Sequence, residues 1–189
     1  MTAQSGSNRD FLKTRLRPMR PTDLSLVLAI ENLSFGTPWP KSAYEYELNQ
    51  NKNSLLWVAE VLLPDSEYQV VGMVVIWLIL DETHIATLAV HLDYRGHGIA
   101  RCLLMTALKE AIKKGATEAT LEVRASNYAA QELYRRFKFK IVGHRPRYYR
   151  DNNEDAIIMT VSHLDEMYIN WLDTGERKDE ACVIPAPAN

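Results

Sequence analysis

A strand, a loop with two glycines and an amphipathic helix are expected in succession between residues 85 and 114. Residues 85–90 are mostly apolar and indicate a strand. From Ile99 onward, apolar residues recur with the spacing of one helical face, at positions 99, 103, 104, 107, 108, 111 and 112. Lys113-Lys114-Gly115 adds cations and a glycine, which are typical of a helix end. A chain with this order must fold so that a strand enters a helix through a short loop.

The loop itself has the features of a phosphate-binding site. A helix start leaves backbone N–H groups unpaired and carries the positive end of the helix dipole. Gly96 and Gly98 have no side chains, so a ligand can approach this backbone closely. Arg95 and Arg101 flank the turn with positive charge. We expect the loop to bind a phosphate or pyrophosphate, although a tight turn without a ligand would also explain the two glycines.

Short apolar segments with turn residues between them surround this unit. Residues 55–63, 68–80 and 84–91 are expected strands, with turn residues at 64–67 and 81–82. Successive strands with such short connections favour antiparallel pairing, whereas strands that flank a helix need a crossover. We therefore expect a mixed sheet. The other expected elements are strands at 15–19, 118–124, 139–144 and 156–161, a helix that starts at Thr22-Asp23, and helices at 41–49, 127–137 and 162–172.

These segments resemble the GCN5-related N-acetyltransferases. The acetyl-CoA loop of that family has the form Gln/Arg-x-x-Gly-x-Gly/Ala, and residues 95–100 read Arg-Gly-His-Gly-Ile-Ala. The bacterial ribosomal-protein-alanine N-acetyltransferases within it are more similar still. They carry a Glu-Val-Arg-x-Ser-Asn strand end, a Leu-Tyr pair, and a later Tyr-Tyr followed by Glu-Asp-Ala. These motifs match residues 122–127, 133–134, 148–149 and 154–156.

The resemblance implies the fold and the domain organisation. The fold is the α/β acyl-CoA N-acyltransferase fold, with a mixed, mostly antiparallel sheet that is split by a bulged strand and flanked by about four helices. We expect residues 15–164 to form the N-acetyltransferase domain. Residues 1–14 are expected to be a disordered tail, and residues 165–189 an acidic C-terminal extension.

The resemblance also implies the reaction. The chain is expected to transfer acetyl from acetyl-CoA, a cosubstrate, to a protein N-terminal α-amine by direct attack, with the N-terminal alanine of a small-subunit ribosomal protein as the expected acceptor. In this family, backbone amides of the splayed strand face the pantetheine and acetyl groups. The residues that the resemblance assigns to acetyl-CoA are Leu88, Ala89, Val90, Arg95, Gly96, His97, Gly98, Ile99, Ala100, Arg101 and Asn127.

Glu122 and Tyr134 are the expected catalytic pair. Acetyl transfer needs a neutral amine and a proton for the leaving thiolate, so it needs a base and an acid. By resemblance, Glu122 accepts the proton and Tyr134 donates one. From spacing alone, Glu122 could instead be a surface carboxylate paired with Arg124 or a lysine. Tyr134 could instead pack in the core beside Leu133.

Aromatic residues mark the expected acceptor site. Trp39 lies in a proline-bounded loop that borders the acceptor site in the resembled enzymes, so Trp39 and Tyr44 are candidates for a wall of that site. Trp39 could instead be a hydrophobic anchor. Tyr148 and Tyr149 lie in a segment that mixes basic and aromatic residues, which could contact RNA. We favour peptide contact there, and assign Trp39, Tyr148 and Tyr149 to substrate binding.

Histidines and cysteines do not indicate a metal site. No two histidines form an i, i+4 pair with a glutamate between them, and the two cysteines have no zinc-site spacing. No metal is expected. Each histidine is expected in a loop or on the surface: His84, His91, His97, His144 and His163.

Composition limits the partners and the compartment. The formal charge of −2 does not suggest bulk nucleic-acid binding, so no direct nucleic-acid partner is expected. The longest apolar run, residues 70–80, is too short to span a membrane. The N-terminal residues lack the apolar core of a signal peptide. A cytoplasmic protein without a membrane partner is the expectation.

Three other functions fit parts of the pattern. The glycine loop is similar to the dinucleotide-binding motif, but Arg101 stands where that motif needs a third small residue. The expected antiparallel strands around the loop also differ from the repeated strand–helix units of a dinucleotide-binding fold. A non-catalytic acyl-CoA sensor would keep the loop, but would not need both Glu122 and Tyr134. An acetyltransferase of the same fold that acts on a lysine side chain or a small amine stays open.

Overall fold

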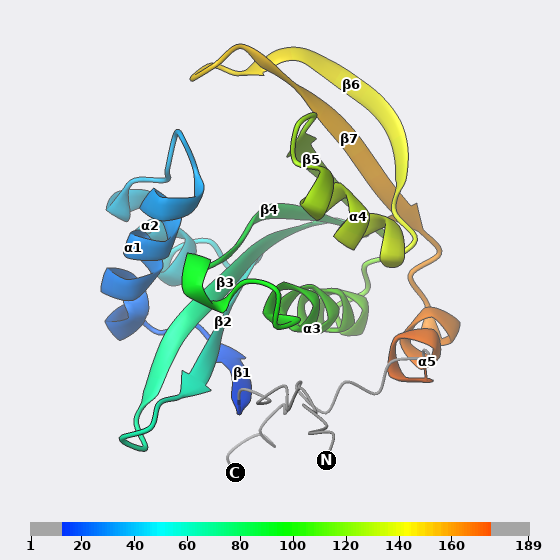
Figure 1. Cartoon of the computed structure of the whole chain (residues 1–189). Helices are drawn as coiled ribbons and strands as arrows, with labels where there is room; N and C mark the ends of the chain where they lie inside the picture. The colour runs from blue at the N-terminus through cyan, green and yellow to red at the C-terminus, as the bar shows by residue number, and fades with distance from the viewer. Residues whose placement is uncertain (1–12, 175–189) are drawn as a thin grey trace, which may run out of the picture.

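A seven-stranded sheet runs through residues 13–174, which are the part of the chain that the computed structural model describes (Figure 1). The strand order is β1-β2-β3-β4-β5-β7-β6. The first four strands pair antiparallel with their chain neighbours, as their short turns predict. The strands are β1 (Thr14–Pro18), β2 (Ser54–Leu62), β3 (Tyr68–Ile79), β4 (Glu82–Val90), β5 (Glu118–Arg124), β6 (Lys140–Tyr149) and β7 (Glu154–Ser162).

Different helices cover the two faces of the sheet. Alternate residues of β3 point to opposite faces, so that Val74 and Ile76 join one core and Met73 and Val75 the other. The first core is covered by α3 (Ile99–Lys113), α4 (Tyr128–Arg136) and α5 (Glu166–Thr174). The second core is covered by α1 (Leu24–Ser34) and α2 (Lys41–Asn49), and Figure 1 shows these two helices apart from α3. Residues 13–174 thus contain five α-helices, where about four were expected.

The sheet splits between β4 and β5. These strands are parallel, with α3 as the crossover, and only Glu82–His84 pairs with Glu118–Thr120. The register of β4 against β3 also shifts at Ala86, which is an extra residue between the pairs formed by Ile85 and Thr87. A bulge of this kind bends a strand and increases its twist. From Ile85 onward, the edge of β4 that faces β5 therefore has no strand partner. The expected mixed sheet, split by a bulged strand, is confirmed.

The β6–β7 hairpin is longer than the sequence pattern indicated. Strands were expected at 139–144 and 156–161, whereas β6 and β7 extend through Tyr149 and back to Glu154. Figure 1 shows the hairpin reaching past β5. The two strands stay paired, although their register shifts between Ile141 and Gly143 and again between Arg145 and Tyr149. The hairpin tip therefore lies beside the split in the sheet.

Residues 165–174, which were assigned to the C-terminal extension, contain α5. Tyr168 is buried in the first core, and its hydroxyl donates a hydrogen bond to the Phe137 carbonyl at 2.7 Å. Residues 1–12 and 175–189, for which a disordered tail and an acidic extension were predicted, lie outside the described residues. No helix in residues 13–174 has the length and apolar character needed to cross a membrane.

Candidate active site

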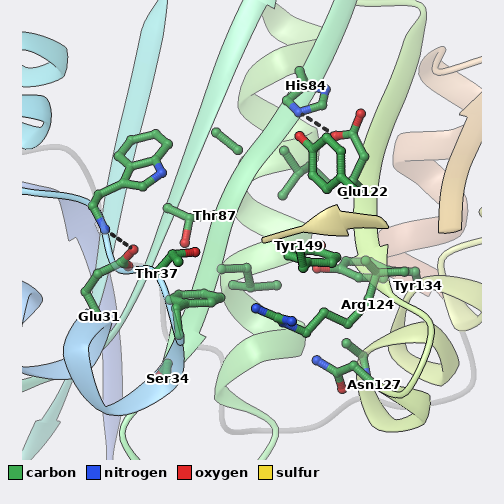
Figure 2. A pocket seen from close by; sticks show the side chains of 18 of the residues that line it. Glu31, Ser34, Thr37, His84, Thr87, Glu122, Arg124, Asn127, Tyr134 and Tyr149 are labelled. Carbon is green, nitrogen blue, oxygen red and sulfur yellow. Dashed lines mark hydrogen bonds and ion pairs between the residues drawn. The ribbon is translucent and has the colours of Figure 1, made fainter. Parts of the chain in front are cut away.

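A cavity of about 530 Å³ lies where β4 and β5 diverge. Figure 2 shows residues from α1 and the loop after it on one side and residues from β5 and α4 on the other. Among the predicted site residues, both members of the catalytic pair and all three acceptor-site aromatics line it. The predicted residues that line this cavity are Trp39, Leu88, Glu122, Asn127, Tyr134, Tyr148 and Tyr149.

The glycine loop forms the turn at the start of α3. Gly96 and Gly98 both have φ of 81°, a left-handed conformation that favours glycine. Apart from the chain neighbours, no atom of residues 13–174 lies within 4 Å of a Cβ placed at either residue, so the described structure leaves space over this backbone. The N-cap residue of α3 is Gly98, which has no side chain to cap the helix, so an anion could approach the backbone at the helix start. Open backbone at the positive end of a helix is suited to a phosphate or pyrophosphate group.

The predicted acetyl-CoA residues outside 96–101 divide into three groups. The side chains of Ala89 and Val90 are buried in the two cores, so only their backbone can face a ligand. Leu88 and Asn127 line the cavity, and the Asn127 side chain caps α4 by accepting a hydrogen bond from the Ala130 N–H at 3.1 Å. The Arg95 guanidinium makes its hydrogen bonds within the protein: it donates one to the Val90 carbonyl and one to Ser34 Oγ.

Glu122 is a nearly buried carboxylate with two cationic or polar neighbours. Its side chain is 10% exposed, with Oε2 3.2 Å from His84 Nε2 and Oε1 2.9 Å from Arg145 Nη2. The contact with His84, more than the charge of Arg145, holds the pKa of Glu122 below its usual value, although burial opposes this. The alternative pairing with Arg124 is wrong, because Arg124 pairs with Asp151 and Glu154.

His84 is part of the site, and its prediction as a loop or surface residue is wrong. It lies in β4, lines the cavity, and its side chain is 20% exposed. Its ring stacks on Trp77 with centroids 5.6 Å apart, and Trp77 in turn stacks on Trp39 at 5.8 Å. The parallel register pairs His84 with Thr120, two residues before Glu122 on the same face of β5. No local pattern in the sequence reveals this neighbour.

Tyr134, the expected proton donor, is a buried residue that lines the cavity. It is 7% exposed, and burial, with a smaller effect of Tyr149, raises the pKa of its phenol far above neutral pH. Its hydroxyl makes no hydrogen bond within residues 13–174, whereas its ring contacts Phe139 with centroids 5.7 Å apart. The two roles considered for this residue, core packing and proton donation, are therefore compatible.

The hairpin tip is attached to β5 and to the loop after α1. Arg124 Nη2 lies 2.7 Å from Asp151 Oδ2, and its guanidinium carbon lies 4.0 Å from the centre of the Tyr149 ring. Asp151 also touches the loop after α1, since a Cβ at Gly36 would lie 2.1 Å from Asp151 Oδ2. The hairpin and this loop thus meet over the cavity.

A buried carboxylate holds the Trp39 loop. Glu31 Oε1 accepts a hydrogen bond from the Trp39 backbone N–H at 3.0 Å, and Oε2 accepts one from the Tyr44 hydroxyl at 2.8 Å. Burial raises the pKa of Glu31. Tyr44 is fully buried in the second core, so its suggestion as a wall of the acceptor site is wrong. Trp39 does line the cavity, whereas Glu31 was not predicted.

Within residues 13–174, no group of three or more His, Cys, Asp or Glu side chains is placed to hold a metal ion. Several lining residues besides His84 and Glu31 were also not predicted as site residues. Most of them are small or apolar: Ser34, Phe35, Thr37, Trp77, Ile85, Ala86, Thr87, Val123, Arg124, Ala130 and Arg150.

Known proteins match most of this chain. The sequence model described as the acetyltransferase (GNAT) family matches residues 24–139. A Bacillus subtilis (strain 168) protein named "Putative [ribosomal protein bS18]-alanine N-acetyltransferase" is 36% identical over 150 residues, which are 79% of this chain and 96% of that protein. The [ribosomal protein bS18]-alanine N-acetyltransferase of Escherichia coli (strain K12) is 32% identical over 145 residues, covering 76% and 93%. The crystal structure of the Escherichia coli ribosomal-protein-S18-alanine N-acetyltransferase superposes with a TM-score of 0.69 and covers 79% of this chain and 94% of that one, at 30% identity.

Proposed function

The chain belongs to the acetyltransferase (GNAT) family, and we propose that it acetylates the free α-amine of a protein N-terminus, with an N-terminal alanine as the acceptor residue. The observation that carries the proposal is that Glu122 and Tyr134 line one cavity between the splayed strands. A base and an acid are the two groups that amine acetylation by a thioester needs. Relatives named as ribosomal-protein-alanine N-acetyltransferases support the choice of acceptor.

Acetyl-CoA supplies the thioester, and residues of this chain would hold it at two places. The backbone N–H groups of 96–101 would bind its pyrophosphate at the start of α3, where the helix dipole favours negative charge. The backbone of residues 88–90, on the unpaired edge of β4, would donate to the pantetheine and acetyl groups. Donors aimed at the thioester oxygen stabilise the charge that develops there.

Glu122 and Tyr134 would divide the proton transfers. Glu122 is ionised at neutral pH and accepts the amine proton through a water molecule. Tyr134 stays protonated because burial raises its pKa, so it can return a proton to the CoA thiolate. The cavity is lined by polar as well as apolar side chains, so water inside it can connect each group to the acceptor.

A chain end suits this cavity better than a side chain from the middle of a protein. The Trp39 loop and the Tyr148–Tyr149 segment lie on its two sides, and Gly36 touches Asp151 above it. An α-amine also has a pKa of about 8, against about 10.4 for lysine, so its neutral form is over a hundred times more populated at pH 7. An acceptor of this kind is made in the cytoplasm, which is the compartment that we propose.

Mass spectrometry of a panel of peptides with acetyl-CoA tests the acceptor. A peptide that begins with alanine and contains lysines should gain one acetyl group, located at its terminus by fragmentation. A matched peptide with a blocked terminus should gain none. Lysine acetylation of the blocked peptide at a comparable rate would instead establish a lysine acetyltransferase of the same fold.

A further inference from the structure

We infer that His84 and Glu122 act as one proton-accepting pair, and that the acceptor amine's proton comes to rest on the His84 imidazole. This inference rests on the proposed acetyl transfer to an amine, and adds a catalytic residue to it. His84 Nε2 lies 3.2 Å from Glu122 Oε2, both side chains line the cavity, and both are mostly buried. Figure 2 shows this contact at the divergence of β4 and β5.

Glu122 alone is a weak base for an amine. The ordinary pKa of a glutamate is about 4.3, so transfer from an α-ammonium of pKa about 8 is unfavourable by roughly 5,000-fold. The contacts of Glu122 lower its pKa further. For a free imidazole, with a reference pKa of about 6.5, the same transfer is unfavourable by only roughly 30-fold. A pair that delivers the proton to an imidazole is therefore a better acceptor than the carboxylate alone.

The surroundings of His84 suit a charged imidazole. Glu122 of β5 is the carboxylate that faces it and can hold the imidazolium as an ion pair. The indole of Trp77 of β3 lies parallel to the ring within 18°, and an indole face attracts a cation. Trp77 is fixed in turn by its Nε1–H, which donates to Glu47 Oε2 of α2 at 3.1 Å.

Arg145 and Tyr149 of β6 also lie near the pair. Arg145 contacts the other carboxylate oxygen, Oε1, and its side chain is 54% exposed, so solvent screens its charge. Tyr149 is near Glu122 and stays neutral below its raised pKa of about 12. Thr120, which is paired with His84 in the sheet, does not titrate. Glu122 is thus the group that stabilises a proton on His84.

The proton transfer balances within the pair and the acceptor. An N–H bond of the ammonium breaks, its electron pair stays on the nitrogen as the nucleophile, and a new N–H bond forms on His84, through water or Glu122. Glu122 remains a carboxylate at the end of the step. The imidazolium then loses its proton to water, which restores the pair for the next turnover.

The test compares His84→Gln with His144→Gln, a matched change at an exposed histidine of β6 outside the cavity. Glutamine keeps an N–H donor for Glu122 but cannot take up a proton. We measure kcat against pH with an alanine-first peptide and saturating acetyl-CoA. His84→Gln should lower kcat about 10²-fold or more and remove an acidic limb that wild type and His144→Gln share. The affinity for acetyl-CoA should not change.

Two results would overturn the inference. One is a kcat for His84→Gln within about twofold of the control; the other is a lower kcat with an unchanged pH profile, which indicates a packing role. As a second readout, imidazole added to His84→Ala should restore turnover, and equal addition to Glu122→Ala should not. If the wild type acetylates lysines and not termini, the proposed acceptor is wrong, and the same comparison then tests His84 on the lysine substrate.

Discussion

The Arg124 guanidinium stacks on the Tyr149 ring, 4.0 Å from its centre, and the same group pairs with Asp151 and Glu154. One side chain at the end of β5 therefore holds both strands of the hairpin that covers the cavity. Because Arg124 side-chain exposure is 20%, these contacts are screened less than those of a surface pair.

Removing this attachment should weaken acceptor binding more than acetyl-CoA binding. For Arg124→Met we expect the loss of about 1–2 kcal/mol of contacts, and so a rise in the peptide KM of roughly 5- to 30-fold. Steady-state kinetics with an alanine-first peptide measures it. Arg136→Met, which removes an exposed arginine paired with Glu132 on α4, is the control. An unchanged peptide KM would show that the hairpin is held by other contacts.

The acetyl-CoA loop can be tested by a branched side chain at Gly98. Gly98→Val should weaken acetyl-CoA binding by about 1–3 kcal/mol, the scale of overpacking, because its Cβ enters open space that the ligand needs. Calorimetry measures the affinity. Gly115→Val is a close control, since Gly115 ends α3 with φ of 95° and equally open space. It carries similar backbone strain away from the ligand, so equal losses in both variants would refute the placement.

The parts of the site that could be predicted are those whose residues lie close together in the sequence. The glycine loop, α3 and β5 follow from local periodicity, and Glu122 and Tyr134 follow from motifs on consecutive elements. His84 and Glu122, by contrast, meet only through the parallel register of β4 and β5, which leaves no trace in either strand. A pattern of apolar residues cannot report such a register.

The hairpin and Tyr44 show two other limits of sequence patterns. Most of β6 is exposed and contains Pro146, so no alternation marks its second half as a strand; pairing with β7 extends it. Tyr44 was taken as a site aromatic, but its hydroxyl finds a buried partner in Glu31, which makes full burial possible. Both outcomes depend on contacts between residues far apart in the chain.

The proposed roles of Glu122 and Tyr134 make a sharper kinetic prediction than those of the binding residues. Glu122→Gln and Tyr134→Phe should each lower kcat by about 10² to 10⁴, the range for acid–base groups. Acetyl-CoA affinity should stay nearly constant, because neither side chain belongs to the loop at 95–101. Glu118→Gln, on the same strand but outside the cavity, is the control for β5. Full kcat in either variant, with chemistry rate-limiting, would remove that residue from the mechanism.

The raised pKa of Tyr149 predicts how the free energy of unfolding changes at high pH. Burial raises its folded pKa to about 12, whereas an unfolded tyrosine has a pKa of about 10. In this interval the unfolded chain loses the proton and the folded protein keeps it. Stability that is fully present below pH 10 should therefore be lost as the pH rises toward 12.

Tyr149→Phe removes the titrating hydroxyl, so the free energy of unfolding of this variant should fall less steeply between pH 10 and 12. Urea unfolding at a series of pH values measures both slopes, with Tyr128→Phe, an exposed tyrosine, as the control. Equal slopes for wild type and Tyr149→Phe would mean that Tyr149 titrates alike in both states, and that the hairpin does not bury its hydroxyl in solution.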